Sequence, residues 1–274
     1  MREQTFAAPG DVSGEALLAQ LRAELQAERM QCQALAQELA AVRAGADDLA
    51  GAVSHDLRAN LRHIVAYAGL VREELGEAPK PELLSYLETV TRSAQRMGLQ
   101  MSGLLALSQI GRVPLDLAAL DVRALIEEAR QGLPVELAGR QVAWHVADDF
   151  PLVQGDAALL RQLWSHLLSN ALKFTALRAP ARVELGWEAL PDASLCALFV
   201  RDNGAGFNPR LKDRLFRPFQ RLHGAGPFDG LGLGLAQAKK IVQRHGGSIE
   251  AESDGESGCL VRFTLPRAAG AAAP

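Results

Sequence analysis

The N-terminal part of the chain has the apolar spacing of a coiled coil. From Leu18 onward, apolar side chains recur at alternating steps of three and four residues over five heptads, as at a seam between two helices. If Leu18 occupies the first core position, Glu24 and Glu38 each precede an arginine by five residues, the pairing expected between parallel strands. We therefore expect residues 15–50 to form a parallel coiled-coil signalling helix between two copies. The alternative is a single amphipathic helix packed against its own domain.

The apolar spacing changes near His55, where three consecutive steps of four replace the alternation. Such a stutter locally unwinds a supercoil. The segment 76–81, which contains Gly and Pro, then breaks the helix, and a second helix with one apolar stripe ends near Gly111. Because a hairpin with one stripe per helix buries too little area alone, we expect residues 51–112 to join a second copy in a dimeric four-helix bundle.

The remaining pattern mixes short strands with helices, so the expected fold class is multidomain, with α-helical segments followed by an α/β sandwich over 113–266. The expected helices lie near 122–130, 156–174 and 235–244, and the expected strands near 142–146, 182–188, 195–201, 248–252 and 259–265. Residues 1–14 and 267–274 show no periodicity and are expected to be a flexible N-terminus and a disordered tail.

Composition narrows the possible partners. An apolar content of 48% supports a core, but a formal net charge of −3 lacks the basic excess that nucleic-acid binding needs. The three cysteines lie far apart in the sequence, which argues against a disulfide framework or a structural zinc site. No stretch approaches the ~20 apolar residues of a membrane helix, and the N-terminus has no apolar run for export. We expect a cytoplasmic protein with no nucleic-acid partner and no membrane insertion.

Two glycine-rich segments are candidates for a nucleotide site. Residues 202–206 read DNGAG directly after an apolar strand, and residues 230–235 read GLGLGL directly before a helix. Glycines at these spacings let backbone N–H groups approach phosphates, and a helix N-terminus adds a favourable dipole. Asp202 at the strand end suits adenine, because a carboxylate accepts from the N6 amine and repels the O6 of guanine. For either segment in isolation, an ordinary tight turn would be the favoured interpretation.

The helix expected at 156–174 adds polar groups. Asn170 and Lys173 are one turn apart and face the same way, opposite the apolar stripe. An amide oxygen can hold Mg²⁺, and an ammonium group can neutralise a phosphate. Without the glycine segments, a solvated helix face would be the simpler interpretation.

Five segments, in this order, resemble the boxes of bacterial sensor histidine kinases. They are SHDLRANLRHI at 54–64, QLWSHLLSNALKFT at 162–175, VRDNGAGFN at 200–208, LFRPFQRLH at 215–223 and GLGLGLAQAKKIVQRHGG at 230–247. Around RDNGAGF, FQRLH and KKIVQRHGG the residues are most similar to the kinase modules of phytochrome-type sensors. The resemblance implies a dimerisation and histidine-phosphotransfer hairpin followed by an ATP-binding domain of the Bergerat (GHKL) type, shared with gyrase and MutL.

The resemblance also assigns roles to matching residues. It implies that His55 is the phosphoacceptor with Asp56 as its acidic helper, that ATP and Mg²⁺ are the cofactors, and that Asn170 is the Mg²⁺ ligand. It makes Asp202 the reader of adenine N6 and Arg221 a candidate contact of the γ-phosphate. The residues it places around the nucleotide are Asn170, Lys173, Phe174, Asp202, Gly204, Gly206, Phe216, Phe219, Arg221, Gly230, Gly232 and Gly234.

The sequence departs from the family's pattern at three places, and each departure leads to an expectation. Asn60 replaces a frequent proline, so the helix kink is expected to be weak. Ala59 stands where kinases with phosphatase activity commonly carry Thr or Asn, which predicts feeble phosphatase activity. His166 stands where an Asn is frequent, and the lid between Arg221 and Gly230 is short; both are expected to slow nucleotide turnover. For the histidines other than His55 we expect structural or surface roles: His63, His145, His166, His223 and His245.

We therefore expect an ATP-dependent protein histidine kinase of a two-component system. It would phosphorylate His55 and pass the phosphoryl group to an aspartate on a response-regulator receiver domain, with input from an upstream sensor through the coiled coil. A non-catalytic dimeric scaffold gated by nucleotide is the main alternative. An ATPase that moves DNA or client proteins would retain the glycine segments but would not need the SHDLR segment.

Overall fold

The computed structural model describes residues 12–75, 80–133, 141–222 and 230–268; in the first helix it leaves out side chains that include those of 39–55. The chain divides into two units, residues 1–55 and 56–274. The expected lid, residues 222–229, lies almost wholly outside the described residues. Helix α1, Val12–Glu74, contains the expected coiled-coil segment. In its first unit, the described side chains of the heptad leucines are about half exposed, from 48% at Leu25 to 57% at Leu35.

The second unit begins with a helical hairpin made by the end of α1 and by α2, Pro81–Ile110. Proline suits the first turn of α2 because its missing N–H has no helical partner there. Small residues lie where the two helices approach: Ala68 and Ala94 are buried, and Gly98 faces Leu61. Helix α2 has Gly111 as its C-cap, so the expected end of the second helix near this residue is confirmed, whereas most of the expected break at 76–81 lies outside the described residues.

The C-terminal domain is built on a mixed five-stranded sheet, in the order β2-β4-β5-β7-β6. Its strands are β2 (Val142–Val146), β4 (Ala181–Ala189), β5 (Leu195–Asp202), β6 (Ile249–Glu252) and β7 (Cys259–Pro266). Only the β2–β4 pair is parallel. A separate antiparallel pair joins β1 (Leu117–Asp121) to β3 (Leu152–Asp156). The expected α/β sandwich is confirmed, whereas β1 and β3 were not expected.

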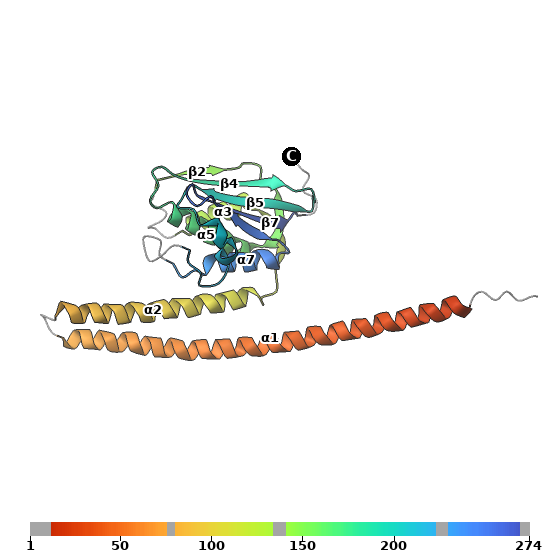
Figure 1. Cartoon of the computed structure of the whole chain (residues 1–274), viewed down its shortest axis with the longest axis horizontal. Coiled ribbons are helices and arrows are strands. Elements are labelled where there is room, and N and C mark those ends of the chain that lie inside the picture. The colour runs from red at the N-terminus through yellow and green to blue at the C-terminus, as the bar shows by residue number, and fades with distance from the viewer. Residues whose placement is uncertain (1–11, 76–79, 134–140, 223–229, 269–274) are drawn as a thin grey trace, which may run out of the picture. The chain divides into compact units, whose positions relative to one another are not determined.

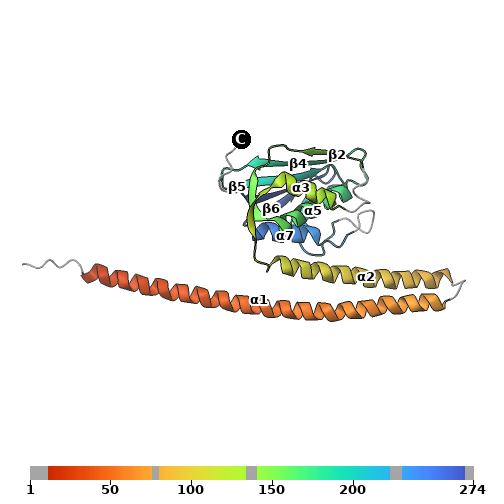
Figure 2. The ribbon, with the colours of Figure 1, turned by 180° about the vertical axis from the view of Figure 1, so that it is seen from behind.

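Helices cover one face of this sheet, as the two opposite views show (Figures 1 and 2). They are α3 (Val122–Gln131), α5 (Ala157–Phe174) and α7 (Gly234–Arg244); the shorter η1 (Pro209–Leu211) and α6 (Lys212–Leu215) follow β5. The core lies between the helices and the sheet, where Trp164 of α5 meets Phe263 of β7 edge to face, with ring centroids 5.4 Å apart. The expected stripe on α5 is buried: Leu160, Leu163, Leu167 and Ala171.

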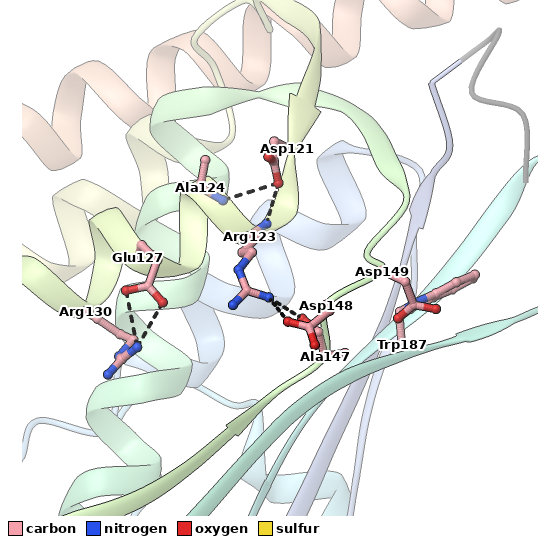
Figure 3. Close-up of polar contacts among 9 residues, drawn as sticks. All are labelled: Asp121, Arg123, Ala124, Glu127, Arg130, Ala147, Asp148, Asp149 and Trp187. Atoms are coloured by element: carbon pink, nitrogen blue, oxygen red, sulfur yellow. Dashed lines mark hydrogen bonds and ion pairs between the residues drawn. The ribbon is translucent and has the colours of Figure 1, made fainter. Parts of the chain in front are cut away.

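Hydrogen bonds made by Asp121 and Arg123 hold the edge of the domain next to α3. The Asp121 carboxylate accepts from the backbone N–H groups of Arg123 and Ala124, which closes the first turn of α3 (Figure 3). The Arg123 guanidinium in turn donates to the Ala147 carbonyl at 3.0 Å and to the Asp148 carboxylate at 2.7 Å. This arginine therefore ties the β2–β3 loop to α3.

Among the helices of the described residues, none combines the length and the apolar character needed to cross a membrane. All three cysteines are unpaired thiols, with Cys196 buried in the sheet.

Candidate nucleotide site

A cavity of about 380 Å³ opens between α5, the end of β5 and the start of α7. It brings together nine residues that the sequence placed around a nucleotide: Asn170, Lys173, Phe174, Asp202, Gly206, Arg221, Gly230, Gly232 and Gly234. These residues come from separate segments of the chain, so the fold assembles them. Cavities of this size are typical of small-molecule sites.

Among the described residues that line this cavity, Asp202 is the only one with an acidic side chain, and it ends strand β5. It is 8% exposed, and its carboxylate accepts from the Gly204 N–H at 2.8 Å. Burial raises the pKa of the Asp202 carboxyl to about 6, against backbone hydrogen bonds from Gly204 and Cys259 that lower it. At neutral pH most of this group is ionised. A carboxylate has about four acceptor positions, so two N–H partners leave capacity for a donor on a ligand.

The walls next to Asp202 are apolar. Leu167 and Ala171 of α5, Val200 of β5 and Val261 of β7 line them together with Phe207. Such a surface suits a flat aromatic base, because stacking buries apolar area while one polar group fixes the orientation. The Cys259 thiol also lines the cavity, but burial raises its pKa to about 12, so it stays protonated at neutral pH.

Positively charged side chains and glycine backbone line the other end of the cavity. Lys173 reaches it from α5, and a side chain at Gly230 would place a Cβ only 2.8 Å from the Lys173 ammonium. Gly232 has φ +71°, and a Cβ there would lie 2.6 Å from the Gln220 carbonyl oxygen, so only glycine fits this turn.

Helix α7 begins at Gly234 with no side-chain cap, so its first N–H groups have no partner from a capping side chain. Backbone amides, a helix N-terminus and Lys173 together form a setting that favours phosphates. Asn170 lines the same cavity and carries an amide oxygen, and Mg²⁺ at nucleotide sites uses one or two protein oxygens together with phosphates. The residues present therefore fit a nucleoside triphosphate with Mg²⁺.

Some expected site residues lie elsewhere. Gly204 supports Asp202 from outside the lining, and Phe216 packs against the core with Lys239 above its ring at 5.9 Å. Phe219 is 41% exposed with φ +62°, and its N–H donates to the Gly232 carbonyl. Asp56 is exposed on α1. His55 lies on the same helix, and its side chain is among those that the structure leaves out.

Three lining or adjoining groups were not among the residues predicted to contact the nucleotide. His166 lines the cavity one turn before Asn170, and burial lowers its pKa, against a hydrogen bond with Gln237 that raises it. The Gln237 amide also donates to the Gly103 carbonyl of α2 at 3.0 Å, and Gly103 itself lines the cavity. The sequence did contain a signal for His166, because the helical spacing places it on the same face as Asn170. Nothing in the sequence brings Gly103 close to Gln237, because 134 positions separate them.

Comparisons with known proteins identify the domains to which these residues belong. A family described as "His Kinase A (phospho-acceptor) domain" matches residues 46–112, and one described as "Histidine kinase-, DNA gyrase B-, and HSP90-like ATPase" matches residues 155–269. The chain is 29% identical over 259 residues to the methanogenesis regulatory histidine kinase FilI of Methanothrix harundinacea, covering 94% of this chain and 29% of that protein. It is 33% identical over 220 residues to cyanobacterial phytochrome B of Nostoc, covering 80% of this chain and 29% of that protein.

The fold has solved counterparts as well. The crystal structure of full-length ShkA in complex with AMPPNP superposes with a TM-score of 0.59 at 24% identity, covering 83% of this chain and 47% of that one. The chain spans about 29% of the length of the FilI and phytochrome relatives. With a phosphoacceptor-type helical domain followed by a GHKL-type ATPase domain, the chain belongs to the sensor histidine kinases and contains their catalytic core.

Proposed function

We propose that this chain is an ATP-dependent protein histidine kinase of a two-component system, which phosphorylates His55 and passes the phosphoryl group to an aspartate of a response regulator. The cavity carries the proposal, because it combines a buried carboxylate beside apolar walls with a cationic, glycine-lined end. This pairing suits adenine at one end and phosphates at the other. The ShkA structure, solved with AMPPNP, supports the same ligand class.

The chemistry follows from ordinary group properties. A histidine with a pKa near 6.5 is mostly neutral at pH 7 and above, so the Nε2 lone pair can attack the γ-phosphorus without prior deprotonation. The new N–P bond forms as the bond from the γ-phosphorus to the bridging oxygen breaks, and ADP leaves with that electron pair. The Nδ1 proton is then left on an imidazolium, which Asp56, the next residue, would stabilise or deprotonate.

Charge neutralisation supplies much of the remaining rate enhancement in phosphoryl transfer. Lys173 and Arg221 line the cavity and would act on the phosphate oxygens. Mg²⁺, held by Asn170 together with the phosphates, would neutralise charge on the β- and γ-phosphate oxygens. For transfer to occur, the domain that binds ATP must bring the γ-phosphorus to His55.

We also propose that the kinase acts as a homodimer paired through residues 15–50 and 51–112. The proposed domains are a flexible N-terminus at 1–14, the coiled-coil helix at 15–50, the phosphotransfer hairpin at 51–112, the ATP-binding domain at 113–266 and a disordered tail at 267–274. The remaining proposed partners are a response-regulator receiver domain and an upstream sensor that acts through the coiled coil, in the cytoplasm.

The direct test is incubation of the full chain with γ-labelled ATP and Mg²⁺, comparing the wild type with His55→Gln. The wild type should acquire a label that is lost in acid, because a phosphohistidine N–P bond hydrolyses at low pH, and the variant should remain unlabelled. Label that persists in His55→Gln would assign the acceptor elsewhere. ATP binding without any labelling of the wild type would instead favour the non-catalytic scaffold.

A further inference from the structure

The 202–206 loop, which follows β5, is held by side chains outside the nucleotide cavity. A Cβ at Gly204 would lie 2.7 Å from the Asp202 carboxylate and from the Phe174 carbonyl oxygen, so only glycine fits there. Glycine, however, has the widest backbone freedom of any residue. The orientation of its peptide groups must therefore be fixed by neighbouring residues.

Arg178, in the connection between α5 and β4, provides such a constraint. Its Nε and Nη2 atoms both donate to the Gly204 carbonyl, at 3.3 and 3.0 Å. The N–H on the other side of that peptide, from Ala205, donates to the Phe174 carbonyl at 3.1 Å. The 204–205 peptide is therefore clamped at both its oxygen and its nitrogen.

The same guanidinium reaches a second segment. Its Nη2 also donates to the Glu256 carbonyl in the turn between β6 and β7. Within that turn the Ser253 hydroxyl donates to Gly258 and accepts from the Phe207 N–H at 3.0 Å. Arg178 therefore holds the middle of the loop, and Ser253 holds the residue just after it, against the same turn.

We infer that Arg178 is a positioning residue for adenine recognition, acting through Gly204 on Asp202. The Gly204 N–H, which belongs to the preceding peptide, donates to the Asp202 carboxylate at 2.8 Å. Holding the 204–205 peptide limits the backbone rotation at Gly204 that would turn this N–H away from the carboxylate. Arg178 itself does not line the cavity. Without the hydrogen bonds from Arg178 to Gly204, the Asp202 carboxylate is therefore held less firmly in one orientation, although no ligand contact is removed. The inference rests on the proposed reading of adenine by Asp202.

Lysine cannot replace this arginine fully. A guanidinium presents a planar set of donors that can serve two carbonyls at once, whereas an ammonium on a flexible stem acts as a point donor. We therefore expect Arg178→Lys to restore part of what Arg178→Met loses.

The chain offers a matched control in Arg123, which also clasps a loop through a backbone carbonyl, but at the α3 edge (Figure 3). The experiment measures the dissociation constants of the full-length wild type, Arg178→Met, Arg178→Lys and Arg123→Met for ATP and GTP, with the thermal midpoint of each. Arg178→Met should weaken ATP binding about fivefold, roughly 1 kcal/mol, with little change in the affinity for GTP. The ratio of ATP affinity to GTP affinity should therefore fall. Arg123→Met should keep the wild-type preference even where its midpoint falls.

The inference would be overturned if Arg178→Met kept the wild-type ratio of ATP affinity to GTP affinity, or if Arg123→Met lowered this ratio as much as Arg178→Met does. Asp202→Asn, measured alongside, separates this inference from the function on which it depends. If Asp202→Asn keeps both ATP affinity and ATP preference, the proposed recognition of adenine fails and the inference fails with it. If Asp202→Asn loses the preference while Arg178→Met keeps it, only the role of Arg178 is wrong.

Discussion

A buried carboxylate that reads a neutral amine must be ionised when the ligand binds, and Asp202 is close to the limit of that requirement. Its pKa of about 6 results chiefly from burial, so the folded state favours the protonated form more than the unfolded chain does. Its contribution to folding stability is therefore complete below about pH 4 and is lost as the pH rises through 6. Recognition of the ligand is thus obtained at some cost in stability, as is common at binding sites.

This titration predicts a pH dependence of nucleotide binding. Below pH 6 a proton must leave Asp202 before it can accept from adenine, so ATP affinity should fall by up to about tenfold per pH unit. Asp202→Asn has no such proton and should bind ATP weakly with a flatter profile. Titration calorimetry from pH 5 to 8 measures both, and the protonation of ATP itself affects the two proteins equally. Parallel profiles for the two proteins would contradict the assignment.

Ala59 lies four residues after His55 and offers a methyl group where a polar side chain could orient a water molecule. We expect the protein to clear a phosphorylated response regulator slowly, because nothing at that position would position the attacking water. The half-life of the phosphorylated regulator, measured with Mg²⁺ in the presence and absence of the kinase, should differ little. Rapid Mg²⁺-dependent clearing by the wild type would show that another residue performs this role.

At the scale of elements, α7 contacts α2 along its whole length. Leu233, just before α7, packs on Gly103, and Gln237 donates to the Gly103 carbonyl. At the far end of α7, Arg244 donates to the Ile110 and Val113 carbonyls, each at 2.6 Å. The first of these bonds satisfies an acceptor at the C-terminal end of α2, where helical partners are missing, and the second satisfies an acceptor just beyond that end. Both Gly103 and Leu233 line the nucleotide cavity, so α2 forms part of its wall.

Two glycines of α2 allow this contact to be tested with one kind of substitution. A Cβ at Gly98 would lie 3.9 Å from Leu61, an ordinary contact, whereas one at Gly103 would lie 2.3 Å from Leu233. Gly98→Ala should raise the thermal midpoint by about 2–4 °C, since alanine favours the helix by about 1 kcal/mol. Gly103→Ala should lack that gain and bind ATP several-fold more weakly, because Leu233 must shift within the cavity wall. Identical behaviour of the two variants would argue against the contact.

The sequence predicts those elements whose patterning is local. Strand Cys259–Pro266 alternates buried and partly exposed residues, and α5 carries its buried stripe at helical spacing, so both were located within a residue or two. Strand Leu117–Asp121 was missed, because its residues are mostly exposed and it pairs only with Leu152–Asp156. Its order depends on a distant partner rather than on its own pattern.

The candidate site divides in the same way. Residues within the glycine segments or beside them, such as Asp202 and Lys173, could be placed from the sequence because their neighbours along the chain indicate the chemistry. Gly103 and Arg178 could not be placed, since their importance arises from contacts with residues that are distant in sequence. Phe219 is the opposite case, because it lies in a matching segment but outside the cavity lining that the described residues form.

At the scale of the whole molecule, the hairpin exposes apolar side chains at regular steps of seven residues. On α1 these are Leu57, Ile64 and Val71, and on α2 they are Leu83, Val90, Met97 and Leu104, each 40–49% exposed. These positions adjoin the face through which α1 and α2 pack together, where Ala68 and Ala94 are buried. Apolar side chains repeating every seven residues on two helices are typical of a four-helix bundle formed by two hairpins.

A second copy of the chain is therefore the expected cover for these residues, and the wild type should sediment at micromolar concentration with twice the 29.4 kDa mass of one chain. Val90→Glu combined with Met97→Glu should give monomers, because two buried carboxylates per helix have no partner in an apolar seam. Gln95→Glu combined with Ser102→Glu adds the same charges, also seven residues apart, at other exposed positions of α2, and should remain dimeric. A monomeric wild type, or dissociation of the control as well, would show that this apolar surface has another use.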